Sequence, residues 1–231
     1  MLLSKNSPKL ILASASPRRS QLLSNLGLEF TVVASQVDEA IAPGLSPGQA
    51  VTDLASRKAL AVAEKLSIEA KSSPNQEATV IIAADTIVVN EGNLLGKPVS
   101  EEEAMNMLLS LSGKKHEVYT GLALVAFEGG VARAPLTRSV VSKVCFRRLE
   151  PAEIKAYVAS GEPMDKAGAY AMQGKASAFV QSIEGCYTNI IGLPMPELDN
   201  AAWPGCKSAW LLNNSTKNLS CLAYSDDVPW C

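Results

Sequence analysis

The sequence has few of the residues that carry metal and nucleophile chemistry in many enzymes. It holds one histidine, His116, and five cysteines without a Cys-x-x-Cys pair or a neighbouring histidine. This pattern indicates neither a zinc site nor a disulfide framework. A reducing cytoplasmic compartment is the expectation that follows. A serine–histidine–aspartate triad would depend on His116 alone, and no residues near it support one.

The sequence also lacks long apolar runs and a strong charge of either sign. No apolar run reaches the about 18 residues that a membrane span needs, so we expect no membrane association. The N-terminal apolar run is broken by Ser14 and Ser16, which does not fit a secretory signal. The net charge of −2 argues against nucleic acid as a partner, and any phosphate site must be a local concentration of positive charge.

Apolar runs, helical spacing and turn residues alternate along the 231 residues, which predicts an α/β fold with a sizeable core. All three tryptophans and three of the cysteines follow Met195, where no clear periodicity appears. We therefore expect one domain over residues 1–195 and a divergent, weakly ordered tail over 196–231. The expected strands are 10–13, 28–34, 79–84, 87–89, 94–95, 118–127, 131–148 and 178–183, and the expected helices are 17–26, 47–66, 100–113 and 151–160. A flexible connection is expected over 67–78.

Residues 10–19 form the most informative stretch. An apolar run ends at Ala13, Ser16 is a good N-cap, and Pro17 suits the first helical position. Arg18 and Arg19 then fall in the first helical turn, where the helix dipole disfavours cations. That placement indicates an anion, and phosphate is the usual one. A solvent-facing basic turn is the alternative.

Two other segments place an acidic residue and a lysine where they are suited to face a ligand. Asp85 comes after the apolar run 80–84, and open α/β sheets place ligand-facing groups at the ends of buried strands. Thr86 beside it is suited to hydrogen-bond the same ligand; a cap or turn acid is the alternative reading of Asp85. Lys97 lies between Gly96 and Pro98 in a rigid turn, without the rest of a P-loop, so a merely solvated lysine is its alternative.

The segment 161–174 combines turn residues, small residues, Lys166 and Gln173. Lys166 is suited to phosphate, and the Gln173 amide can read a base edge through its paired donor and acceptor. A long structural loop is the alternative. Basic groups for phosphates, together with Asp85 and the Asp38–Glu39 pair for a metal or a base, suit metal-assisted attack on a phosphoanhydride.

Taken in order, these blocks resemble the Maf-type nucleoside triphosphate pyrophosphatases over about residues 8–195. The resemblance implies an elongated mixed sheet in two lobes with a central cleft, related to the inosine-triphosphatase-like enzymes. It also implies hydrolysis of a nucleoside triphosphate to the monophosphate and pyrophosphate with Mg²⁺ or Mn²⁺, and homodimers are frequent in the family. The matching blocks are 12–19, 84–86, 96–98, 119–121, 160–170, 173–174 and 192–194.

The resemblance assigns roles to individual residues. Asp85 is the expected general base and a metal ligand, and Glu39 is the second expected metal or water ligand. The identities of Arg18, Thr86 and Gln173 match the branch that acts on dTTP and UTP. A 7-methyl-GTP pyrophosphatase and a nucleotide-binding regulatory module without turnover are the alternatives. The expected substrate-binding residues are Ser16, Arg18, Arg19, Lys58, Thr86, Lys97, Lys166 and Gln173.

The C-terminus departs from the family pattern. After the Gly192-Leu193-Pro194 block the family usually continues into an apolar helix, whereas here residues 196–199 lead into the segment with tryptophans and cysteines. Pro204 and Gly205 disfavour one long helix. If the usual helix completes the core, its loss exposes apolar surface. We therefore expect this protein to melt at a higher temperature when a regular family C-terminus replaces its own.

Overall fold

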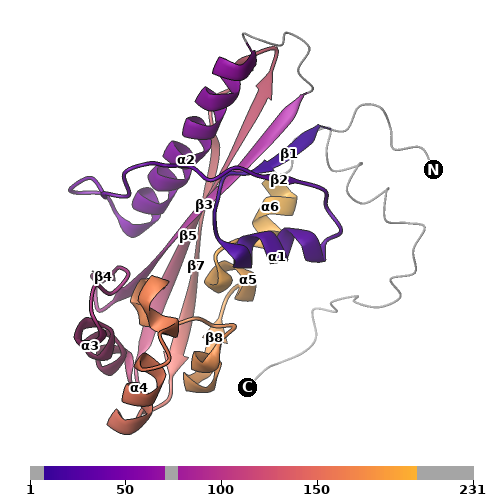
Figure 1. Cartoon of the computed structure of the whole chain (residues 1–231). Helices are drawn as coiled ribbons and strands as arrows, with labels where there is room; N and C mark the ends of the chain where they lie inside the picture. Colours follow the sequence, from indigo (N-terminus) through magenta and orange to yellow (C-terminus); the bar gives the residue numbers. More distant parts are fainter. Residues whose placement is uncertain (1–7, 71–77, 202–231) are drawn as a thin grey trace. The chain divides into compact units, whose positions relative to one another are not determined.

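The computed structural model describes residues 8–70 and 78–201, and the predicted α/β fold is confirmed (Figure 1). The strands form one sheet in the order β2-β1-β3-β5-β7-β8, with β4 paired to β3 and β6 paired to β5. The strands are β1 (Lys9–Leu12), β2 (Thr31–Val32), β3 (Thr79–Asn90), β4 (Asn93–Leu95), β5 (Lys115–Glu128), β6 (Val131–Ala132), β7 (Leu136–Phe146) and β8 (Val180–Glu184). The helices are α1 (Pro17–Asn25), α2 (Pro47–Ala70), α3 (Glu101–Leu111), α4 (Pro151–Val158), α5 (Tyr187–Ile191) and α6 (Met195–Ala201), with 3₁₀ turns η1 (Glu162–Asp165), η2 (Ala167–Ala169) and η3 (Lys175–Phe179).

The sheet is mixed. β1 runs parallel to both β2 and β3. The pairs β3–β5, β5–β7 and β7–β8 are antiparallel. The prediction that a strand ends at Ala84 is wrong, because β3 continues to Asn90 while pairing with β5. The predicted strand 28–34 is likewise reduced to two residues. Helix α2 extends past its predicted end to Ala70, and the rest of the predicted connection, 71–77, lies outside the described residues.

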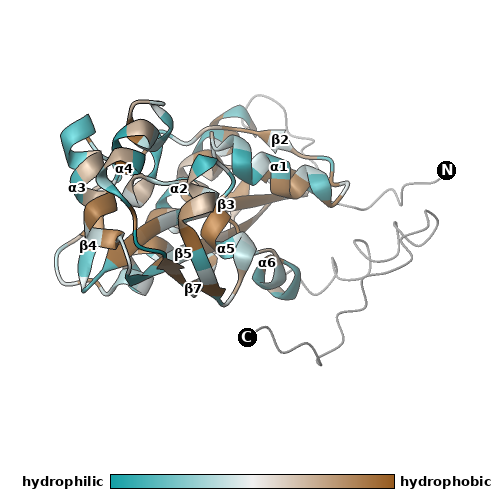
Figure 2. Cartoon of the chain, turned by 90° about the horizontal axis from the view of Figure 1, so that it is seen from below, coloured by the Kyte–Doolittle hydropathy of each residue, from teal (hydrophilic) through white to brown (hydrophobic). Residues whose placement is uncertain are grey.

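Two hydrophobic clusters cover different parts of the long strands. Helix α2 packs on one part, where Ile81, Ala123 and Phe127 are buried. Helices α3 and α4 pack at the other end of the same strands, where Leu108 and Phe146 are buried. Figure 1 shows α2 and the α3–α4 pair at these separate positions, and Figure 2 shows hydrophobic colouring along the strands that they share. The strands β3 and β5 therefore belong to both clusters.

A glycine allows α2 to approach the sheet closely. A Cβ atom on Gly121 of β5 would lie 2.1 Å from the backbone oxygen of Val51, which is too close for any side chain. Gly121 is the β5 partner of Asp85 in the ladder. Lys58 lies about two helical turns after Val51, so it faces the sheet on the same side of α2. The absence of a side chain at Gly121 thus brings Lys58 near Asp85.

The chain after Pro194 begins with a helix. Residues Met195–Ala201 form α6, in which Leu198 is 2% exposed and Ala201 is buried. The expected tryptophan- and cysteine-bearing tail lies outside the described residues from 202 onward, and the domain boundary at 195 stays a prediction. Among the described helices, none combines the length and the apolar character that a membrane crossing requires.

Candidate active site

A pocket of about 700 Å³ opens at a gap in the sheet beside β3. β1 pairs with residues 79–82 of β3, and β4 pairs with residues 88–90. Among the described strands, none covers residues 83–87 on that side. Asp85 and Thr86 reach the pocket from this uncovered segment, with side chains on opposite faces of β3 because they are adjacent in a strand. Asp85 therefore sits in the middle of a strand, rather than at the end of one as the sequence suggested.

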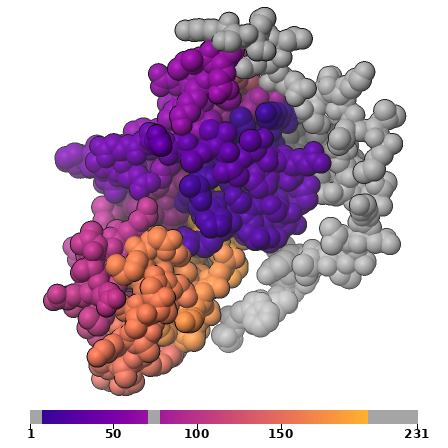
Figure 3. Space-filling model, in the orientation of Figure 1, coloured from indigo at the N-terminus to yellow at the C-terminus, as the bar shows by residue number. Residues whose placement is uncertain are grey.

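All ten predicted site residues line this pocket. They come from the segment after β1, from the segment between β2 and α2, from α2, from β3, from the turn after β4 and from the segment around η1 and η2. In Figure 3 the indigo N-terminal segment and the orange segment of the last third meet on one face. The residues are Ser16, Arg18, Arg19, Glu39, Lys58, Asp85, Thr86, Lys97, Lys166 and Gln173. Asp38 is not among the lining residues; its side chain accepts a hydrogen bond from the backbone of Ala40.

Helix α1 begins as its sequence predicts. Ser16 takes the N-cap position with extended backbone and Pro17 follows as the first helical residue. The side chain of Ser16 makes no capping hydrogen bond; instead its backbone N–H donates to Ser14 Oγ at 3.2 Å. The hydroxyl of Ser16 is thus not used as a cap. Gly27, with φ of +70°, lies just beyond the helix in the left-handed conformation that commonly ends helices.

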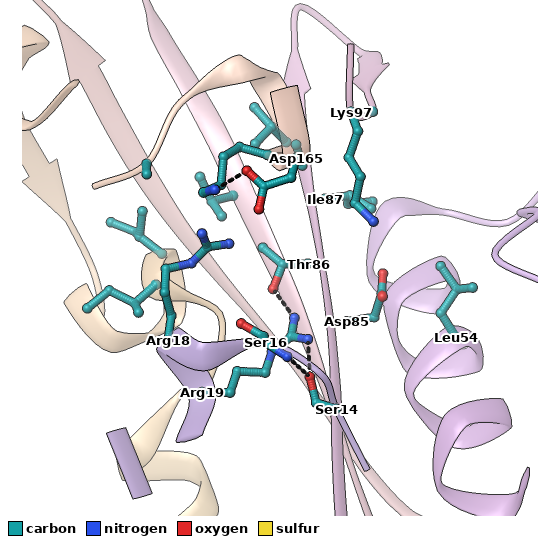
Figure 4. Close-up of a pocket in the computed structure, with 18 of the residues that line it drawn as sticks. Ser14, Ser16, Arg18, Arg19, Leu54, Asp85, Thr86, Ile87, Lys97 and Asp165 are labelled. Atoms are coloured by element: carbon teal, nitrogen blue, oxygen red, sulfur yellow. Dashed lines mark hydrogen bonds and ion pairs between the residues drawn. The ribbon is translucent and has the colours of Figure 1, made fainter. Parts of the chain in front are cut away.

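The two arginines of α1 have different surroundings. Arg18 extends into the pocket (Figure 4). Arg19 donates from Nε to the backbone oxygen of Gly192 at 2.7 Å, from Nη1 to Ser14 Oγ at 3.1 Å and from Nη2 to Thr86 Oγ1 at 3.1 Å. Desolvation by burial lowers the pKa of Arg19 below its usual value, and the nearby charge of Asp85 partly opposes this. The three acceptors are neutral, so the charge of Arg19 suits an incoming anion.

The centre of the site is an ammonium between two carboxylates. Lys58 Nζ lies 2.5 Å from Asp85 Oδ1 and 2.6 Å from Glu39 Oε1. Lys58 and Asp85 are 8% and 9% exposed, while Glu39 is exposed enough to meet solvent. Lys97 Nζ approaches the other oxygen of Glu39 at 3.4 Å. The hydrogen bond from Lys58 lowers the pKa of Glu39, so Glu39 is ionised.

The Asp85–Glu39 pair fits a divalent cation of the magnesium class. Within the described residues no group of three or more histidine, cysteine or acidic side chains gathers around one point. Mg²⁺ is usually held by one or two carboxylates, several waters and the phosphates of its substrate. Asp85 and Glu39 supply two carboxylates on one part of the pocket, each also in contact with the Lys58 ammonium, so the donor set matches that requirement in type and number.

The far wall of the pocket comes from the predicted loop 161–174, which folds into η1, η2 and turns. Lys166 is paired with its neighbour Asp165, and this contact lowers the pKa of the Asp165 carboxyl. Gln173 is exposed at the pocket rim, where its amide is available to a ligand. Lys58 is one of the predicted substrate-binding residues, although no sequence motif singles it out. A signal was present in the sequence, since a lysine among Leu54, Ala55, Ala59 and Val62 lies on the apolar face of α2.

The family model described as Maf-like protein matches residues 9–202. The chain belongs to the Maf family. Its relatives include a protein of Desulforamulus reducens, 49% identical over 83% of this chain and 94% of the relative, and one of Geobacter sulfurreducens, 47% identical over 82% and 93%. Both are named dTTP/UTP pyrophosphatase.

Solved structures show weaker similarity to this Maf-family chain. A nucleoside-triphosphatase, dITP/XTP pyrophosphatase, of Mycobacterium abscessus is 18% identical, with a TM-score of 0.33 over 61% of this chain and 75% of that one. The Ham1 protein of Staphylococcus aureus is 11% identical, with a TM-score of 0.30 over 74% and 90%. Similarities at these TM-scores carry no argument about this chain.

Proposed function

We propose that this Maf-family protein is a metal-dependent nucleoside triphosphate pyrophosphatase. Its substrates are dTTP, UTP and related pyrimidine nucleotides, modified ones included, and its products are the monophosphate and pyrophosphate. The observation that carries this proposal is the buried Asp85–Lys58 pair, joined by the exposed Glu39, in a pocket lined with further cations. The names of the relatives support the choice of substrate.

The side chains that line the pocket have different roles in hydrolysis. The cationic side chains Arg18, Arg19, Lys97 and Lys166 hold the triphosphate. Lys58 fixes Asp85 Oδ1, which leaves Oδ2 to accept a proton from the attacking water. The water oxygen forms a bond to the α-phosphorus while the bond to the α–β bridging oxygen breaks, and pyrophosphate leaves. Mg²⁺ or Mn²⁺, held by Asp85 and Glu39, supplies Lewis-acid stabilisation of the phosphate charge when bound.

Base selection is assigned to Gln173, Thr86 and Arg18. An amide at the rim offers one donor and one acceptor, and uracil and thymine present a matching acceptor–donor pair on one edge. Cytosine presents the donor and the acceptor in the reverse order, so the Gln173 amide favours the uracil type when it is held in one orientation. We further propose a cytoplasmic location, which the cysteine usage supports, and a homodimer, which light scattering of the purified protein tests directly.

The experiment is pyrophosphate release from dTTP, UTP, CTP, 5-methyl-UTP and 7-methyl-GTP with Mg²⁺ or Mn²⁺. Rapid release from dTTP and UTP, abolished in Asp85→Asn, is the expected result. Asp38→Asn is the matched control, because Asp38 lies outside the pocket and asparagine keeps its turn hydrogen bond to Ala40; its activity stays at the wild-type level.

Two outcomes would contradict the proposal in different ways. Comparable rates on 7-methyl-GTP and dTTP would reject the pyrimidine preference but keep the reaction. Nucleotide binding by a folded protein that releases no pyrophosphate from any substrate would reject turnover and favour the regulatory module.

A further inference from the structure

Arg19 is connected to two fully buried residues that the proposed chemistry does not use. Thr86 Oγ1, which accepts from Arg19, lies 2.9 Å from Thr120 Oγ1 on the neighbouring strand β5. Thr120 Oγ1 lies 2.9 Å from the backbone oxygen of Asn189 in α5 and donates to it. Thr120 and Asn189 are both 0% exposed. A chain of hydrogen bonds thus runs from the pocket into the protein interior.

The direction of this chain follows from counting protons. Each threonine hydroxyl has one proton to donate. The backbone oxygen of Asn189 can only accept, so the proton of Thr120 is used on Asn189. Thr86 must then donate to Thr120, and its oxygen receives the Arg19 Nη2–H. Every bond in the chain is oriented one way, from Arg19 through Thr86 and Thr120 to Asn189.

The far end of the chain is itself anchored. The side-chain amide of Asn189 donates to the backbone oxygen of Val118 and to Ser142 Oγ, each at 3.0 Å. Three residues later, Gly192 accepts directly from Arg19 Nε. A Cβ atom on Gly192 would lie 3.3 Å from both Arg19 Nε and Thr86 Oγ1, so the α5 end also fits tightly against the guanidinium. The segment 189–192 therefore holds Arg19 from two directions.

We propose that Thr120 and Asn189 are positioning residues that orient Arg19 for the phosphates of the substrate. Three of the five N–H groups of Arg19 are used on protein oxygens, so the direction of the remaining two is fixed. Because the proton of Thr86 is committed to Thr120, Thr86 can accept a hydrogen bond from a nucleotide but cannot donate one. The inference rests on the proposed function only in that it takes a nucleotide as the ligand.

The test measures binding without turnover. The probe is α,β-methylene-UTP with Mg²⁺, titrated calorimetrically into wild-type protein, Thr120→Val and Thr120→Ser. Thr120→Val removes the hydroxyl and is expected to weaken binding about tenfold, the usual effect of one lost hydrogen bond. Thr120→Ser keeps the hydroxyl and is expected to stay within about twofold of wild type. If Thr120→Val does not fold, Thr120→Ala removes the same hydroxyl without adding a methyl group.

The control variant separates positioning from general loosening of α5. Cys186→Ala removes the Sγ contact to Thr188 at the start of α5 but leaves intact both the chain from Arg19 to Asn189 and the anchors of Asn189. It is expected to lower the melting temperature with little change in analogue affinity. In an Arg19→Ala background, Thr120→Val should cause no further loss of affinity, because residue 120 then has no guanidinium to orient.

Three results would overturn the inference: wild-type affinity in Thr120→Val, an equal loss in Cys186→Ala, or a full additional loss on top of Arg19→Ala. These comparisons do not depend on hydrolysis. A wild-type protein that binds the analogue but releases no pyrophosphate from UTP would reject the proposed turnover, and the Thr120 series would still decide the positioning role.

Discussion

The buried histidine makes stability depend on pH. His116 is 2% exposed and packs edge-on against the rings of Phe146 and Tyr170. Its Nε2 lies 2.8 Å from the Tyr170 hydroxyl, and its Nδ1 has no hydrogen-bond partner in the described part of the chain. Protonation would put a charge at this apolar position, so desolvation lowers the pKa of His116 from 6.5 to about 4.

The sign and size of the effect follow from linkage. Between these two pKa values the unfolded chain binds a proton that the folded protein does not, so stability rises with pH across this window. Below pH 4 the full loss is roughly 3 kcal/mol, and at pH 5 the free energy of unfolding is about 2 kcal/mol lower than at pH 7.5. Above pH 6.5 His116 contributes no pH dependence.

Urea unfolding at pH 5.0 and pH 7.5 tests this for wild-type protein and His116→Gln. Glutamine keeps a polar group near Tyr170 but does not titrate, so its pH dependence should be smaller by about 2 kcal/mol. The carboxylates titrate equally in both proteins and cancel in the comparison. If His116→Gln loses as much stability at pH 5.0 as the wild type does, the reasoning about the unpartnered Nδ1 is refuted.

Three other predictions concern the site and its support. Lys58→Met leaves the facing carboxylates without their ammonium and should lower kcat for UTP by at least about 100-fold, a loss typical of a removed preorganised charge. Activity within threefold of wild type would exclude the role of Lys58 in fixing Asp85. Gly121→Ala should lower the free energy of unfolding by about 3 kcal/mol through the clash with α2, which urea titration measures. The control Gly96→Ala places its methyl group in open space and should change the free energy of unfolding little. Gln173→Ala should reduce the preference for UTP over CTP in kcat/KM by about tenfold, and an unchanged ratio would place base recognition elsewhere.

Local signals in the sequence predicted local structure well. Pro17 and Gly27 bound α1 as their backbone preferences require. The turn at Glu91 and Gly92, both with positive φ, joins β3 to β4, which overlap the predicted strands 87–89 and 94–95. Strand β3 was cut short in the prediction because the Asp85–Thr86 pair interrupts its apolar run. Its continuation depends on pairing with β5, which no local pattern encodes.

The contacts between the site residues could not be predicted from the sequence for the same reason. The three predicted groups of residues, around 16–19, 85–97 and 166–173, do line one pocket. One of the three residues that accept hydrogen bonds from Arg19, however, is Gly192, 173 positions away along the chain. The roles of Thr120 and Asn189 depend on which strand and helix pack beside β3, and only the fold supplies that information.

The unbroken ladder between β3 and β5 has a mechanical consequence. Residue pairs run without a bulge from Thr79–Phe127 to Val89–Glu117, through both hydrophobic clusters and past Asp85. A hinge that separated β3 from β5 between the clusters would have to break the hydrogen bonds of this ladder. The continuous pairing across Asp85 therefore favours adjustment to substrate by the segments that carry Glu39, Lys97 and Gln173, which lie outside these two strands. We accordingly expect Asp85 and Thr86 to keep their spacing when a nucleotide binds.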